Sequence, residues 1–156
     1  LYLRDELGAG VAGSGLAFAS FAGAMAVMRF AGDAVRNRIG AVATLRWSGI
    51  VGAAGLTAAA LSPTDLGAVA AFAVAGLGVA NMVPVIFSAA GNHAGMTPGA
   101  AMATVTMVGY SGILIAPSSI GFVAEAAGFR LTFGTLALLL LVVSAMAGRA
   151  AAAERA

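Results

Sequence analysis

The segment RFAGDAVRNRIGAVATLR, residues 29–46, is the most informative part of this 156-residue chain. It carries four of the eight basic residues and lies between two long apolar runs. Charge is scarce elsewhere, since 9% of all residues are charged and 61% are hydrophobic. Positive clusters between apolar spans are typical of the cytoplasmic loops of helical membrane proteins, so we expect residues 29–46 to form such a loop.

The composition excludes several classes of protein. Soluble domains are about 25% charged, whereas this chain has 9% charged residues, no Lys and 22 Gly. Small residues at that frequency suit helices that pack closely in lipid. Basic residues do not alternate with aromatic ones in a stripe, which argues against nucleic-acid binding. Because Cys is absent, a disulfide framework or a thiolate metal site is excluded.

Apolar segments divide the chain into membrane spans. Each is close to the ~20 residues that cross a bilayer core, and no segment shows the two-residue alternation of a membrane barrel. We therefore predict an all-α membrane protein with five transmembrane helices. The expected spans are residues 11–31, 41–61, 66–88, 100–123 and 131–148.

The charges between the spans predict the orientation. With residues 29–46 in the cytoplasm, Arg149 and Arg155 also lie inside, whereas Arg4 and Arg130 lie outside. The N-terminus is then outside and the C-terminus cytoplasmic. The chain begins with Leu1 and lacks the pattern of a signal peptide, so we expect a fragment of a longer protein.

The pattern Arg29-x-x-Gly32-Asp33-x-x-x-x-Arg38-x-Gly40 resembles the conserved loop motif of the major facilitator superfamily. The segments GLGVANMVPVIFSAAGN (76–92) and GYSGILIAPSSIGFVAE (109–125) resemble helices ten and eleven of its bacterial members. The resemblance covers essentially the whole chain. It implies a twelve-helix secondary transporter of the bacterial plasma membrane. Residues 1–10 would then be the end of helix seven and a loop, followed by helices eight to twelve of the C-terminal six-helix bundle.

The loop departs from the usual family pattern, Gly-x-Leu-x-Asp-Arg-x-Gly-Arg-Arg. Aligned on Arg38 and Gly40, Asp33 occupies the first Gly position and Asn37 the acidic position. Ala41 replaces the basic residue that follows Gly40.

The resemblance implies that this loop is a cytoplasmic gate, which holds helix ends together in one transport state. Its spacing is compatible with that role, because Arg29, Asp33 and Arg36 share one face of a helix. The alternative is an orientation signal combined with helix caps, of little energetic value. The expected gate residues are Arg29, Asp33, Arg36, Asn37, Arg38 and Gly40.

Four further residues are candidates for a substrate cavity or a hinge: Asn81, Pro84, Tyr110 and Pro117. Asn81 is a polar amide within an apolar span, and such a group must face other helices or a watery cavity. Pro84 removes a backbone hydrogen bond close by. Hydrogen-bond glue between helices is the alternative role for Asn81.

Small residues at four-residue spacing predict close helix packing in two places. Gly15, Ala19 and Gly23 form such a face in the first span. Gly112 and Ala116 form another in the fourth.

The expected function is secondary transport of a small solute by alternating access, together with the missing N-terminal half. No cofactor, metal or enzymatic activity is expected: His93 is the only histidine and is expected in a solvated loop, and the spans lack paired catalytic groups. No acidic residue lies mid-span, so the acid of any proton-coupled cycle is expected in the missing half. The alternatives are a five-helix membrane scaffold or assembly protein and an intramembrane enzyme.

Overall fold

The computed structural model describes residues 2–5 and 11–155. The described chain is almost entirely helical, with short turns between the helices. Its elements are α1 (Tyr2–Asp5), α2 (Val11–Ile39), α3 (Ala41–Leu61), α4 (Asp65–Val79), α5 (Met82–Gly91), α6 (Pro98–Ala127), α7 (Phe129–Ala145) and the 3-10 helix η1 (Met146–Arg155). The all-α prediction is confirmed.

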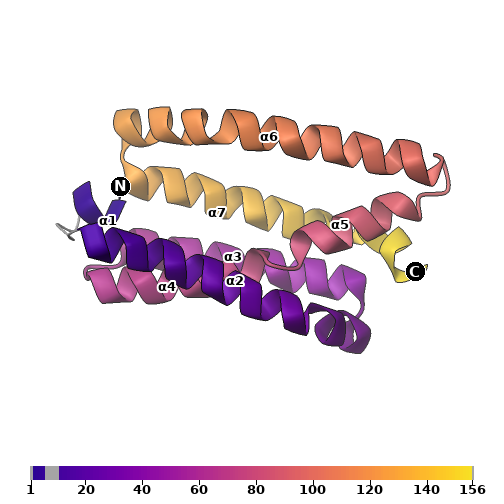
Figure 1. The fold of residues 1–156 in the computed structure, drawn as a ribbon, viewed down its shortest axis with the longest axis horizontal. Helices are drawn as coiled ribbons and strands as arrows, with labels where there is room; N and C mark the ends of the chain where they lie inside the picture. The colour runs from indigo at the N-terminus through magenta and orange to yellow at the C-terminus, as the bar shows by residue number, and fades with distance from the viewer. Residues whose placement is uncertain (1, 6–10, 156) are drawn as a thin grey trace.

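The long helices run roughly side by side (Figure 1). Helices α2, α3 and α4 form one packed group, and α7 packs on α3. Helix α6 occupies the opposite edge of the molecule, where its main contacts are with α5 and α7. The C-terminal η1 packs on α3 and α5.

The prediction of a loop at residues 29–46 is wrong, because these residues are helical except at Gly40. Helix α2 continues to Ile39, eight residues beyond the expected end of the first span, and α3 begins at Ala41. The segment contains no proline that would end the helix. Arg36 and Arg38 in the last turn of α2 stabilise the helix by interacting with the negative end of its dipole. Gly40 alone makes the turn, with a φ of 82° that glycine adopts without strain.

Each expected span overlaps one of the long helices, and where each span crosses the membrane stays a prediction. The third span is broken into α4 and α5, which meet at Ala80 and Asn81. Within the described part of the chain, four segments are long and apolar enough to cross a membrane: Gly15–Ile39, Asp65–Gly91, Pro98–Ala127 and Phe129–Glu154. Helix α3 is not one of them, because Arg46 and three glycines lower its hydropathy. The count of five spans is therefore not confirmed.

Close helix packing lies between α3 and α4. A Cβ added at Gly78 would collide with the backbone of Gly52, and one added at Gly55 would collide with the backbone of Ala75. Glycine allows these two backbones to touch.

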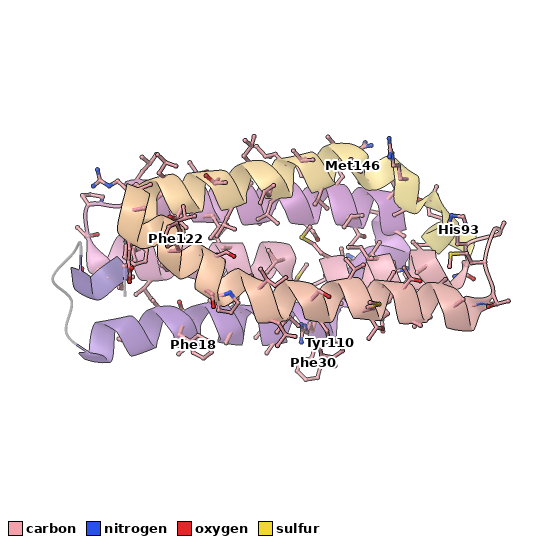
Figure 2. All side chains as sticks on the ribbon, turned by 90° about the horizontal axis from the view of Figure 1, so that it is seen from above. Phe18, Phe30, His93, Tyr110, Phe122 and Met146 are labelled. Carbon is pink, nitrogen blue, oxygen red and sulfur yellow. The ribbon has the colours of Figure 1, made fainter. Side chains whose placement is uncertain are left out.

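The small-residue faces predicted from the sequence are not the packed ones. A Cβ added at Gly15, Gly23 or Gly112 meets no described atom within 4 Å. Bulky apolar side chains on α2 are exposed as well: Phe18 is 75% and Phe30 92% exposed, and both project outward (Figure 2). An extensive exposed apolar surface of this kind is typical of a protein that lies in lipid or against a partner.

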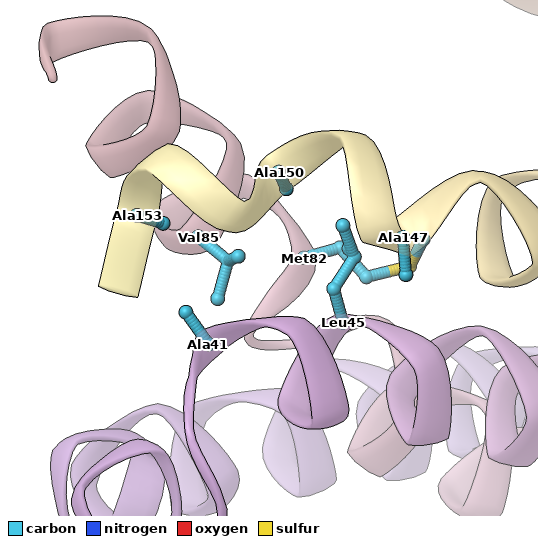
Figure 3. Close-up of a cluster of buried hydrophobic side chains, with 7 residues drawn as sticks. All are labelled: Ala41, Leu45, Met82, Val85, Ala147, Ala150 and Ala153. Atoms are coloured by element: carbon cyan, nitrogen blue, oxygen red, sulfur yellow. The ribbon is translucent and has the colours of Figure 1, made fainter. Parts of the chain in front are cut away.

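Two clusters of packed apolar side chains lie at opposite ends of the molecule. At one end the rings of Tyr2, Phe72 and Phe133 pack edge to face, and the Tyr2 hydroxyl donates to the Ala59 carbonyl over 2.9 Å. At the other end η1 covers the junction of α3 and α5 (Figure 3). The buried members of that second cluster are Ala41, Leu45, Met82, Val85, Ala147, Ala150 and Ala153.

Candidate functional site

The break between α4 and α5 lies at the buried residue Asn81, whose φ of −97° and ψ of 0° differ from regular helix values. Pro84 follows three residues later and has no N–H to donate to the Ala80 carbonyl. Helical hydrogen bonding resumes with Val85, whose N–H donates to the Asn81 carbonyl over 3.3 Å. The sequence thus interrupts this apolar helix at its one mid-span amide.

A cavity of about 380 Å³ adjoins this break. It is lined by Arg29, Gly32, Asp33, Arg36, Thr44, Asn81, Val83, Pro84 and Val85. Three of the expected gate residues therefore lie around one space with the candidates Asn81 and Pro84, and we call this space the α2–α5 cavity. Sequence reasoning had assigned these residues to two separate sites.

Asn81 is 5% exposed, and its side chain lies against Gly32 of α2. A Cβ added at residue 32 would collide with the Asn81 Oδ1. Glycine at position 32 therefore lets the amide approach α2. The amide nitrogen Nδ2 is buried and has no hydrogen-bond partner among the described residues.

Arg36 connects three elements at this end of the molecule. Its Nη2 donates to the Ser88 hydroxyl of α5 over 2.9 Å and to the Ala153 carbonyl of η1 over 2.7 Å. These hydrogen bonds of Arg36 go to α5 and η1 rather than to Asp33, which is exposed one turn away.

The remaining gate candidates lie outside the cavity lining. Asn37 and Arg38 are exposed in the last turn of α2, and Gly40 forms the turn to α3. Beside Gly40, the Glu154 carboxylate accepts a hydrogen bond from the Val42 N–H over 3.3 Å. The contacts of Ser88, Ala153 and Glu154 were missed, because each joins residues at least 52 positions apart and leaves no local pattern.

Tyr110 lines a second cavity, of about 830 Å³, between α5 and α6. The surrounding side chains are mostly apolar and include Ile86, Phe87 and Ile113. Val83 lines both this space and the α2–α5 cavity, so the two adjoin across α5. Pro117 lies farther along α6, which continues through it as one helix.

His93 lies in the segment between α5 and α6, where its Nδ1 accepts a hydrogen bond from the Gly95 N–H over 3.0 Å. It is exposed, as expected for a solvated residue. Within residues 2–5 and 11–155, no three His, Asp or Glu side chains are grouped in a way that could hold a metal ion.

Curated relatives match between 72% and 94% of the chain, and the chain spans less than half of their own length. An uncharacterized MFS-type transporter of Yersinia pestis is 36% identical over 94% of this chain and 38% of its own length. An uncharacterized transporter of Sinorhizobium fredii is 32% identical over 94% of this chain and 39% of its own length. The membrane protein MosC of Rhizobium meliloti is 40% identical over 72% of this chain and 28% of its own length. No solved structure matches the chain.

The family comparison agrees with the architecture of long apolar helices. The family model described as Major Facilitator Superfamily matches residues 1–155. The resemblance that the sequence suggested is confirmed: this chain is an integral membrane protein segment that belongs to the major facilitator superfamily.

Proposed function

We propose that the protein to which this chain belongs moves a small solute across the bacterial plasma membrane by alternating access. The observation that carries this proposal is the α2–α5 cavity, where Arg29 and Asp33 of the family motif lie beside Asn81 at a helix break. Transporters of this type use discontinuous helices to form solute sites between two bundles that rock against each other. The names of two relatives as transporters support the same function.

In this proposal the charged end of α2 is half of a cytoplasmic gate. Arg36 joins α2 to α5 and η1 through its two hydrogen bonds, and these bonds hold the end of the bundle closed. Asp33 is exposed beside the cavity and is free to meet a basic group of another segment in one transport state. The N-terminal half of the full-length protein supplies that opposing surface.

The proposed orientation places the α2–α3 junction and η1 in the cytoplasm and α1 on the outer side. Arg36, Arg38 and Arg149 then lie on the cytoplasmic side, in accordance with the positive-inside rule. The lipid bilayer is the partner of the exposed apolar surface that the other half does not cover.

Charge reversal at Asp33 tests the gate. In the full-length protein, Asp33→Arg is expected to lower uptake or efflux in membrane vesicles at least tenfold without loss of membrane insertion. Glu125→Arg is the matched control, because Glu125 is an exposed acid near the other end of the bundle. Transport by Asp33→Arg that equals transport by the control would remove Asp33 from the gate.

A further inference from the structure

The buried amide of Asn81 has an unused donor. Its Nδ2 carries two N–H groups and is shielded from solvent, yet it has no partner among the described residues. Buried polar groups are almost always hydrogen-bonded, and an unmade bond is costly. The side chain lines the α2–α5 cavity, so a small shift of the amide would let a group that enters this space supply the missing acceptor.

The cavity presents more donors than acceptors. Arg29 and Arg36 line it together with Asn81, and Asp33 contributes its one lining carboxylate among the described residues. The two arginines and one aspartate leave a formal charge of +1. The hydrogen bonds of Arg36 to Ser88 and Ala153 both use Nη2, so Nε and Nη1 remain available.

We propose that the α2–α5 cavity binds an anionic oxygen, as carried by a phosphate or carboxylate group, between Asn81 Nδ2 and the guanidinium groups of Arg29 and Arg36. Guanidinium groups bind such oxygens through charge-assisted hydrogen bonds, which are stronger than neutral ones. The cavity volume of about 380 Å³ falls within the usual range for small-molecule sites.

A cation or an apolar molecule fits this space less well. A cation would face two arginines and would leave the Asn81 donor unpaired. An apolar molecule would leave both the amide and the charged groups without partners, which is costly away from water. The neighbouring Tyr110 cavity, with its apolar lining, differs in this respect.

The anionic oxygen has two possible sources, a soluble anion or the phosphodiester of a phospholipid. Both present the same chemistry to the three donors. The site is a property of the cavity and does not depend on transport, so a binding measurement tests it independently of the proposed function.

The test uses the full-length protein purified in detergent, without a separate step to remove bound lipid. Inorganic phosphate is titrated by calorimetry at constant ionic strength, and native mass spectrometry counts phospholipid molecules that remain bound after purification. The variants are Asn81→Asp, which exchanges the donor for a carboxylate of equal size, and Arg29→Gln, whose side chain is exposed and not required for packing. The matched controls are Asn92→Asp and Arg149→Gln, which lie outside the cavity lining.

Both variants are expected to weaken binding by about tenfold or more, because each removes a hydrogen bond to a charged group. If the variants lose affinity for phosphate alone, the anionic oxygen comes from a soluble anion. If they lose a retained phospholipid that phosphate also displaces from the wild type, the oxygen comes from a lipid headgroup. The proposal is overturned if the wild-type protein binds neither probe, or if both variants bind as the controls do. Since Arg29→Gln leaves the buried packing intact, a failure of Asn81→Asp to fold would not prevent this decision.

Discussion

Glycines of helix α4 pack against neighbouring helices, whereas glycines of helix α6 face open space. In α4, Gly78 touches the backbone of α3, and Gly76 lies against the carbonyl of Phe21 in α2. In α6, an added Cβ at Gly109, Gly112 or Gly121 meets no described atom within 4 Å. The window of α4 and α5 that could span a membrane is 44% buried, and that of α6 is 6% buried.

The difference shows that a small-residue stripe predicts a capacity for close contact but does not identify the partner. Glycine has the same permissive backbone in both helices. Whether another helix packs against these glycines depends on how all the helices of the bundle are arranged. The first three predictions below alter packed contacts, and the last alters the open face of α6.

The largest effect is expected from Gly78→Ala. The new methyl group would overlap the backbone of Gly52, so α3 and α4 would have to separate along their contact. Overpacking of this kind costs about 3 kcal/mol. The free energy of unfolding of the full-length protein, measured by denaturant titration in micelles, should fall by that amount. An unchanged value would contradict the direct α3–α4 contact.

A smaller loss is expected from Arg36→Gln. The shorter amide cannot reach both Ser88 and Ala153, so the tie between α2, α5 and η1 is broken. The loss of one of these bonds from a charged donor costs about 2 kcal/mol. Limited proteolysis should cleave η1 faster in this variant than in the wild type, whereas Arg149→Gln, at an exposed position of η1, should be cleaved at the wild-type rate. Equal cleavage of both variants would show that Arg36 does not anchor η1.

Ser144→Ala tests the contact of α7 with α3. The Ser144 side chain is 4% exposed, and its hydroxyl donates to the Arg46 carbonyl over 2.8 Å. Such hydrogen bonds between membrane helices are worth about 0.6 kcal/mol, which should appear as a small decrease in the free energy of unfolding. Ser118→Ala, on the exposed surface of α6, is the control and should not change it. A decrease at Ser118 as large as that at Ser144 would contradict the comparison.

The smallest effect is expected from Gly112→Ala, the same substitution as at Gly78 but on the open face of α6. The new methyl group meets no described atom within 4 Å, so the unfolding free energy should not fall and should rise by about 0.5 kcal/mol, because Ala has the higher helix propensity. A loss as large as that of Gly78→Ala would show that this face of α6 is packed in the full-length protein. The same denaturant titration serves both variants.

The sequence predicted the class of fold because span length and hydropathy are local properties. Residues 41–61 coincide with α3, and the polar turn after Leu61 is where one helix ends and the next begins. The first helix runs past the expected span because charge marks where a helix leaves the membrane, whereas Gly40 marks where the helix stops. Local spacing also could not show which glycines would be packed.

The candidate site was predicted only in parts. The family motif identified Arg29 and Asp33, helical spacing added Arg36, and the isolated amide identified Asn81. Their shared cavity depends on the packing of α2 against the α4–α5 break. The role of η1 at this end was not predictable, since Arg36 and Ala153 are 117 residues apart. Whether these residues act as a gate and a solute site stays a prediction.

The central claim is that the α2–α5 cavity is exposed to each side of the membrane in turn, and one accessibility measurement tests it most directly. The chain contains no Cys, so Val83→Cys places a single thiol within this segment, on the wall of both adjoining cavities. The full-length protein, with any other cysteine replaced, is treated with a membrane-impermeant thiol reagent in right-side-out and in inside-out vesicles. Alternating access predicts that the thiol reacts in both preparations. Reaction from one side only, while the solubilised protein reacts completely, would contradict the account.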